Sequence, residues 1–175
     1  FQMIRGFSLS PAEVLGILLE GLLSLREGPP GDRRFFARPL LGPTSQPTAL
    51  ESPIGVKLKA FMDACGNAWL HIKRHGTIPA QVALEEQRIG PGDLLGSLAQ
   101  ALVRYGRFGI LPEAIEIRPQ PSIPEAYSRL EFHRRVKDGW RWIPFPEGFE
   151  SPAIVELTAW QTWTLRPAIL AVSGN

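Results

Sequence analysis

Several features common in proteins of this size are scarce in this chain. The sequence has one cysteine, Cys65, so no disulfide can form within it. Its longest apolar segment covers residues 14–25 and is interrupted by Glu20, well short of the roughly 20 apolar residues that span a bilayer. Charge is nearly balanced, with 19 basic and 17 acidic residues and a net charge of +2. We therefore expect no disulfide framework, no membrane span and no nucleic-acid partner.

The short motifs of common enzyme classes are missing as well. The sequence contains no Walker loop, no Gly-x-Gly-x-x-Gly and no Cys-x-x-Cys pair. The stretch at residues 6–10 lacks the second glycine of a nucleophile elbow. Cys65 lies on an apolar helical stripe, and the pair Glu85-Glu86 falls in an expected turn. These observations favour a protein that is not an enzyme, and we expect no cofactor.

Glycine and proline, with 17 residues each, punctuate the chain instead. Ser10-Pro11-Ala12-Glu13 is a capping box that predicts a helix ending at the Gly/Pro cluster of residues 28–31. Residues 34–40 are short, aromatic and bounded by turn residues, which predicts a strand. The Pro/Thr/Ser-rich residues 42–50 predict a surface loop.

A second helix is predicted to begin at Glu51-Ser52-Pro53 and to run to about His75, with Gly76 as its stop. A short strand within residues 78–84 follows, and residues 90–93 open a third helix through Val103. The second helix has an apolar stripe at helical spacing, formed by Leu58, Phe61, Met62, Cys65, Ala68, Trp69 and Ile72.

Two blocks of sequence occur twice and in the same order. Residues 51–61 and 150–160 share six of eleven positions, including Glu-Ser-Pro. Residues 11–16 align with 91–96, and the same offset of 80 aligns residues 35–39 with 115–119. We infer an α+β fold, a single domain over residues 1–175, built from two helix–strand–helix halves (about 5–80 and 81–170) on a shared core. Residues 1–2 are interpreted as a tag remnant and set aside.

The two Glu-Ser-Pro blocks are 99 residues apart rather than 80, so the second half carries about 19 additional residues. They contain Asp138-Gly139, a dipeptide typical of a type I′ turn, which predicts an inserted β-hairpin. Alternation along its strands gathers five candidate ligand-binding side chains on one face: His133, Arg135, Lys137, Trp140 and Trp142.

That hairpin face has two interpretations. Flat indole rings stack on sugars, and Arg and Lys pair with anions, so the face can bind a ligand. Alternatively, the basic groups stack on the indoles as cross-strand cation–π pairs and only stabilise the hairpin.

His71 and His75 are candidate metal ligands, because side chains four residues apart share one face of a helix. A third ligand would have to come from elsewhere, for example His133. The alternative is two solvated histidines near the end of a helix, with no bound metal.

Residues 68–102 contain an amphipathic helix through Ile72, then Gly76-Thr77-Ile78-Pro79-Ala80-Gln81-Val82, then Ile89-Gly90-Pro91-Gly92-Asp93-Leu94-Leu95 and a further helix. This segment resembles pseudomurein-binding repeats, modules attached to prokaryotic cell-wall proteins. The resemblance covers about 35 residues. It implies binding to a wall glycan and an extracellular or cell-wall location, and it assigns no individual ligand-binding residue.

The first functional hypothesis is a non-catalytic binding module for a cell-envelope glycan or similar polymer, using the hairpin face. The second is a structural or oligomerisation domain whose hairpin is a protein interface, since Trp and Arg are typical interface anchors. The third is a metal-dependent hydrolase that uses His71, His75 and His133.

Overall fold

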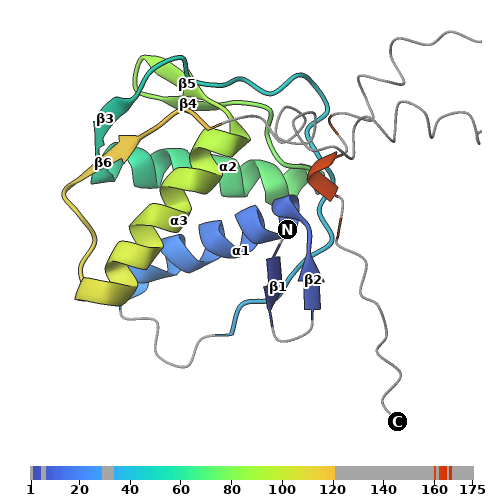
Figure 1. Ribbon diagram of the computed structural model, residues 1–175, viewed down its shortest axis with the longest axis horizontal. Helices are drawn as coiled ribbons and strands as arrows, with labels where there is room; N and C mark the ends of the chain where they lie inside the picture. Colours follow the sequence, from blue (N-terminus) through green and yellow to red (C-terminus); the bar gives the residue numbers. More distant parts are fainter. Residues whose placement is uncertain are drawn as a thin grey trace, which may run out of the picture.

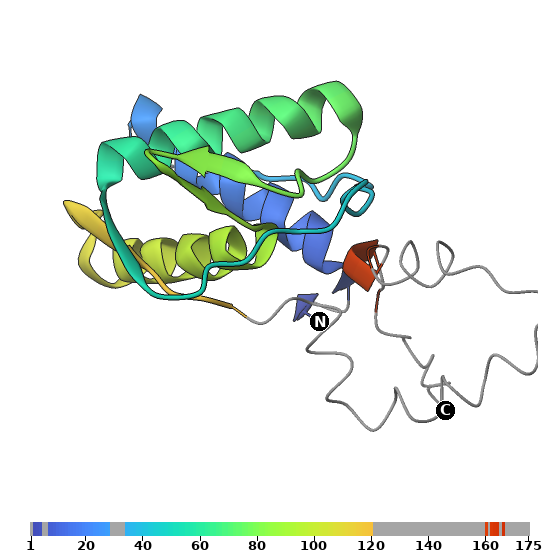
Figure 2. The same cartoon turned by 90° about the horizontal axis from the view of Figure 1, so that it is seen from above.

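A computed structural model describes residues 2–4, 7–28, 34–120, 160, 162–164 and 166. Within these residues, three α-helices pack with three two-stranded antiparallel sheets, which confirms the predicted α+β class (Figure 1). The helices are α1 (Pro11–Ser24), α2 (Leu58–His75) and α3 (Pro91–Phe108). Helix α1 contacts both other helices and lies between them in Figure 2.

The predicted capping box at the start of α1 is present. Glu13 N donates to Ser10 Oγ at 3.3 Å, and Ser10 N donates to Glu13 Oε2 at 2.9 Å. The helix buries Ala12, Leu15, Leu19 and Leu22 completely. It ends at Ser24 and continues as a 3-10 turn, η1 (Leu25–Glu27), before a glycine with a φ of 116°. An apolar face this wide places α1 at the centre of the core.

The start of α2 differs from the prediction. Residues 51–52 form a bend, residues Ile54–Lys57 form strand β3, and the helix begins only at Leu58. Strand β3 pairs with β6 (Ala114–Ile117), and Val56 is buried opposite Ile115. A distant β-branched partner outweighs the local capping signal, because pairing satisfies several backbone groups while a cap satisfies one. The end of α2 is as predicted, at His75 with Gly76 left-handed.

The strand predicted for residues 34–40 is wrong. These residues have no regular secondary structure, and Phe36 is 71% exposed. Only the next residue, Leu41, forms a bridge, which is parallel and joins it to Thr77. The aromatic composition resembles a strand, but this segment lies against helices, and no strand among the described residues pairs with it. Residues 42–50 are irregular, as predicted.

The strand expected within residues 78–84 is shorter and belongs to a hairpin. Strand β4 (Val82–Leu84) pairs with β5 (Gln87–Ile89), and Glu85-Glu86 form the turn, as expected for that pair. Helix α3 begins at Pro91 as predicted, but it continues beyond Val103 to Phe108, where a left-handed Gly109 ends it.

A second hairpin, which no signal used above predicts, precedes α1. Strand β1 (Gln2–Ile4) pairs with β2 (Phe7–Leu9), so Gln2, which was set aside as a tag remnant, pairs with Leu9. The register matches that of β4 and β5 after a shift of 80 residues, and both hairpins lead into a Pro-initiated helix with a capping-box carboxylate. The same shift of 80 residues pairs residues 34–37, which are irregular, with residues 114–117, which form β6.

One hydrophobic core joins these elements, with Phe61 and Cys65 from α2 and Leu94 and Leu98 from α3 buried against α1. Near the C-terminus, the short 3-10 helix η3 (Thr162–Thr164) packs on α1 and buries Trp163. None of the helices in the described residues is both long enough and apolar enough to cross a membrane.

Candidate functional site

An open cleft lies between α1, the irregular segment at residues 34–40 and the C-terminal half of α2. Its volume is about 490 Å³. Helix α1 lines the cleft with its outer side, because its other side is buried in the core. We call this cleft the Trp69 groove, and it is lined by Glu20, Leu23, Ser24, Arg34, Phe35, Trp69 and Lys73.

Trp69 is the aromatic side chain that α2 contributes to the groove. It belongs to the predicted apolar stripe of α2 and retains 9% exposure. Lys73, one turn further along the helix, has its Nζ 5.4 Å from the indole centroid, and Arg38 has its Cζ 5.6 Å from the same ring. Both distances are within the range of cation–π contacts. The indole therefore contacts two cations, Lys73 in the groove and Arg38 beside it.

Charges in and beside the groove are mostly positive. Arg34 and Lys73 line it, Arg38 adjoins it, and Glu20 is the acidic lining residue. Arg38 forms an ion pair with Glu20 at 3.7 Å. Aromatic carbon, cationic donors and one carboxylate acceptor provide both apolar contact and directional hydrogen bonds, which is the usual combination in ligand-binding clefts.

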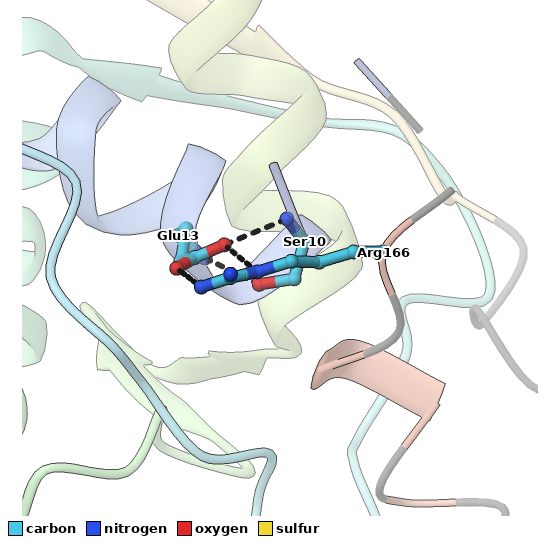
Figure 3. Close-up of polar contacts among 3 residues, drawn as sticks. All are labelled: Ser10, Glu13 and Arg166. Carbon is cyan, nitrogen blue, oxygen red and sulfur yellow. Dashed lines mark hydrogen bonds and ion pairs between the residues drawn. The ribbon is translucent and has the colours of Figure 1, made fainter. Parts of the chain in front are cut away.

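A buried carboxylate, Glu13, lies at the start of α1 (Figure 3). Arg166 donates from Nε to Glu13 Oε2 at 3.0 Å, and its second guanidinium nitrogen donates to Oε1. Burial by itself raises the pKa of Glu13, but the hydrogen bonds from Arg166 and Ser10 outweigh burial and hold the pKa below its ordinary value. This carboxylate is ionised and fully engaged, so it connects two chain segments rather than acting as an acid or base.

Asp93 has a corresponding position at the start of α3 and is also buried. Its Oδ2 accepts from Leu50 N at 3.0 Å and from Gly90 N at 3.1 Å, and its Oδ1 accepts from Gln120 N at 2.9 Å. Three backbone donors from separate segments occupy this carboxylate. Like Glu13, it is positioned for structure rather than for chemistry.

Cys65 is fully buried, and burial raises the pKa of its thiol to about 12. A thiolate nucleophile is disfavoured at such a site. Among the described residues, no group of three or more His, Cys, Asp or Glu side chains could hold a metal ion.

His71 and His75 do lie together, with ring centroids 4.7 Å apart and planes tilted by 47°. His71 Nε2 is 3.3 Å from Thr77 Oγ1. Burial, and then the charge of His75, lower the pKa of His71. The structure therefore brings the predicted pair into contact, without a third ligand from the part of the chain it describes.

The predicted hairpin and its five candidate residues, His133, Arg135, Lys137, Trp140 and Trp142, lie outside the described residues. The Trp69 groove is a site that the sequence analysis missed. Its one local signal is Trp69 followed by Lys73 at i, i+4, which places both side chains on one helical face. The remaining lining residues come from α1 and from the irregular segment at residues 34–40, and the path of that segment has no periodic signal.

No known protein family, curated protein or solved structure matches this chain.

Proposed function

We propose that this protein is a non-catalytic binding module for a cell-envelope glycan or similar polymer, and that the Trp69 groove is a binding site for it. The observation that carries the proposal is an open cleft of about 490 Å³ in which Trp69 and Phe35 adjoin Arg34, Lys73 and Glu20. Its open sides suit a segment of a long ligand better than a small molecule that must be enclosed.

The chemistry of a saccharide fits these side chains. Sugar C–H faces pack on aromatic rings, while hydroxyl and carboxylate groups accept hydrogen bonds from Arg and Lys. Trp69 exposes only a small part of its indole, so Phe35, which is half-buried, shares the apolar contact. Glu20 accepts from sugar hydroxyls and limits the binding of purely anionic ligands.

Two further proposals accompany this one. First, the chain arose by internal duplication, which is supported by the equal register of the β1–β2 and β4–β5 hairpins and by the capping carboxylates Glu13 and Asp93. Second, an inserted hairpin provides a separate contact surface through Trp140 and Trp142. The resemblance of residues 68–102 to pseudomurein-binding repeats favours a wall glycan as the ligand.

Co-sedimentation with insoluble wall polysaccharide and calorimetry with soluble fragments test the proposal. The double variant Arg34→Glu with Lys73→Glu should weaken binding about tenfold or more, because two favourable charges become repulsive. The double variant Trp140→Ala with Trp142→Ala measures the contribution of the hairpin separately. Lys59→Glu is the matched control, because Lys59 is an exposed lysine of α2 outside the groove. Binding that neither double variant reduces would contradict the proposal.

A second candidate function is self-association. Helix α3 and the residues just after it expose Val103 by 54%, Phe108 by 69% and Ile110 by 68%. We propose that these side chains form one apolar patch, which is the kind of surface that marks an interface. Light scattering over a range of concentrations tests this candidate: a dimer that dissociates on Phe108→Ser with Ile110→Ser supports it, and a wild-type monomer at high concentration rejects it.

A further inference from the structure

The C-terminal end of α2 holds two imidazole rings in one arrangement. His71 and His75 are four residues apart and therefore share one face of the helix. Their ring centroids are 4.7 Å apart. His75 is exposed and His71 is partly buried, so a solute can reach the pair from one side. Because both rings project from a regular helix of 18 residues, the backbone fixes the spacing of their attachment points.

The neighbouring Thr77 orients one of these rings. Its Oγ1 lies 3.3 Å from His71 Nε2. In the tautomer with the proton on Nε2, the ring donates to Thr77 and leaves the Nδ1 lone pair free. A hydrogen bond of this kind on the other ring nitrogen is the usual support of a metal-binding histidine. Thr77 is held in turn by its parallel bridge to Leu41 and by the Leu41 N to Gly76 O hydrogen bond of 3.0 Å.

Two opposing effects act on a cation at this pair: the carbonyl end of the helix favours it, and the basic side chains of Lys73 and Arg74 in the last turn disfavour it. The pair lies in the last turns of α2, where the carbonyl ends of the helix favour positive charge. Lys73, which is also in the last turn, has its ammonium 5.4 Å from the Trp69 ring and so is drawn toward the groove. Cys65 cannot compete for the metal, because it is buried in the core.

We propose that His71 and His75 bind one divalent ion of the Cu(II) or Ni(II) type, with water in the remaining positions. Two imidazoles plus water match the nitrogen and oxygen coordination that these ions prefer. Zinc sites use three or four protein ligands, so zinc binds here more weakly. Magnesium and calcium prefer oxygen ligands and do not bind. The proposal is independent of glycan binding at the Trp69 groove.

Calorimetric titration of the full chain, after a chelator has been applied and removed, tests the site. We expect one equivalent of Cu(II) or Ni(II) to bind, in the affinity order Cu(II), Ni(II), Zn(II), with no heat from Mg(II). His71→Asn and His75→Asn should each weaken binding about tenfold or more, because each removes half of the chelate. Asp63→Asn is the control, because Asp63 is an exposed carboxylate on the same helix and lies eight residues before His71, and this variant should bind the ion as the wild type does. The Cu(II) electron paramagnetic resonance spectrum should show nitrogen hyperfine structure that His75→Asn reduces.

Two outcomes would overturn the proposal. One is metal binding that survives both His71→Asn and His75→Asn, which would place the ion elsewhere, for example at the chain terminus. The other is binding lost equally in His133→Asn, which would show that these two histidines alone do not form the site. Circular dichroism confirms that each variant is folded; His75 is exposed, so its replacement should leave the fold unchanged.

Discussion

Arg166 and Glu13 join segments that are 153 residues apart in the sequence, through a two-pronged ion pair at the start of α1. The environments of the partners are unequal, because the Glu13 side chain is 3% exposed and that of Arg166 is 53% exposed. The acid has lost its water and depends on its protein donors, while the base remains half in solvent. Removing the base is therefore expected to cost more than the loss of a surface ion pair.

Replacement of Arg166 by Gln should lower the free energy of unfolding by about 1–3 kcal/mol, because Glu13 would keep its buried charge and lose its strongest donors. Urea unfolding followed by circular dichroism measures the change. Arg26→Gln is the matched control: Arg26 binds Asp63 at 2.8 Å, but both side chains are about half exposed. The control should cost at most about 1 kcal/mol. Equal losses in the two variants would contradict the assigned role of Arg166.

Stability should depend on pH through Glu13. The pKa of Glu13 in the folded protein is below its ordinary value of 4.5, because hydrogen bonds from Arg166 and Ser10 outweigh burial. Its contribution is therefore fully present above the unfolded pKa and is lost as the pH falls through the lower folded pKa. The difference in unfolding free energy between the wild type and Glu13→Gln should be constant near pH 7 and shrink below about pH 4.5. A difference that does not change in acid would show that the carboxylate charge is not the source.

Gly90 should tolerate no side chain. A Cβ at this position would lie 1.5 Å from the carbonyl oxygen of Thr48, which is held in place by the hydrogen bond from Thr48 N to Ala80 O. We expect Gly90→Ala to cost about 3 kcal/mol or more, since backbone must move to make room. Gly106→Ala is the control, because nothing lies within 4 Å of its Cβ position. It should stabilise α3 by about 0.5–1 kcal/mol, so thermal melting should move the two variants in opposite directions.

Asp93→Asn should destabilise the protein by about 2–4 kcal/mol, because an amide has one acceptor oxygen and would turn donors toward backbone N–H groups. The three amides that Asp93 now accepts from belong to Leu50, Gly90 and Gln120. Hydrogen exchange at the Leu50 and Gln120 amides should accelerate in this variant. Asp63→Asn, on the exposed side of α2, should change stability by less than about 1 kcal/mol. Unchanged exchange at both amides would refute the linking role of Asp93.

Local signals in the sequence were sufficient to locate the three helices, but not both ends of each helix. Each signal depends on residues that are close in sequence, so a short window of the chain reveals it. Examples are the Ser10 capping box, the helical spacing of the apolar stripe of α2 and the left-handed Gly76. The start of α2 was predicted too early, because Val56 pairs with Ile115 in a sheet, and Ile115 lies almost sixty residues further along the chain. The strand at residues 34–40 was wrong for the converse reason, since a strand-like composition has no effect without a partner.

The candidate site was harder to predict than the fold. Trp69 was predicted correctly to lie on the apolar stripe of α2, and that assignment concealed its second contact with Lys73 and Arg38. Arg38 reaches the ring from an irregular segment, whose path depends on packing and not on any repeat in the sequence. The ring contact between His71 and His75 was predictable, because four residues of helix determine it.

The long sequence separation between Glu13 and Arg166 has a kinetic consequence. Closing a loop of this length costs more entropy than forming the helices or hairpins, so this contact is expected to form late, after the rate-limiting step of folding. An interaction absent from the transition state changes the unfolding rate and leaves the folding rate nearly unchanged. In stopped-flow experiments, Arg166→Gln should therefore increase the unfolding rate constant and leave the refolding rate constant at its wild-type value. A slower refolding phase would instead place the contact in the folding nucleus. In the expected case, the ion pair serves as a kinetic barrier to opening, and it determines how long each molecule stays folded.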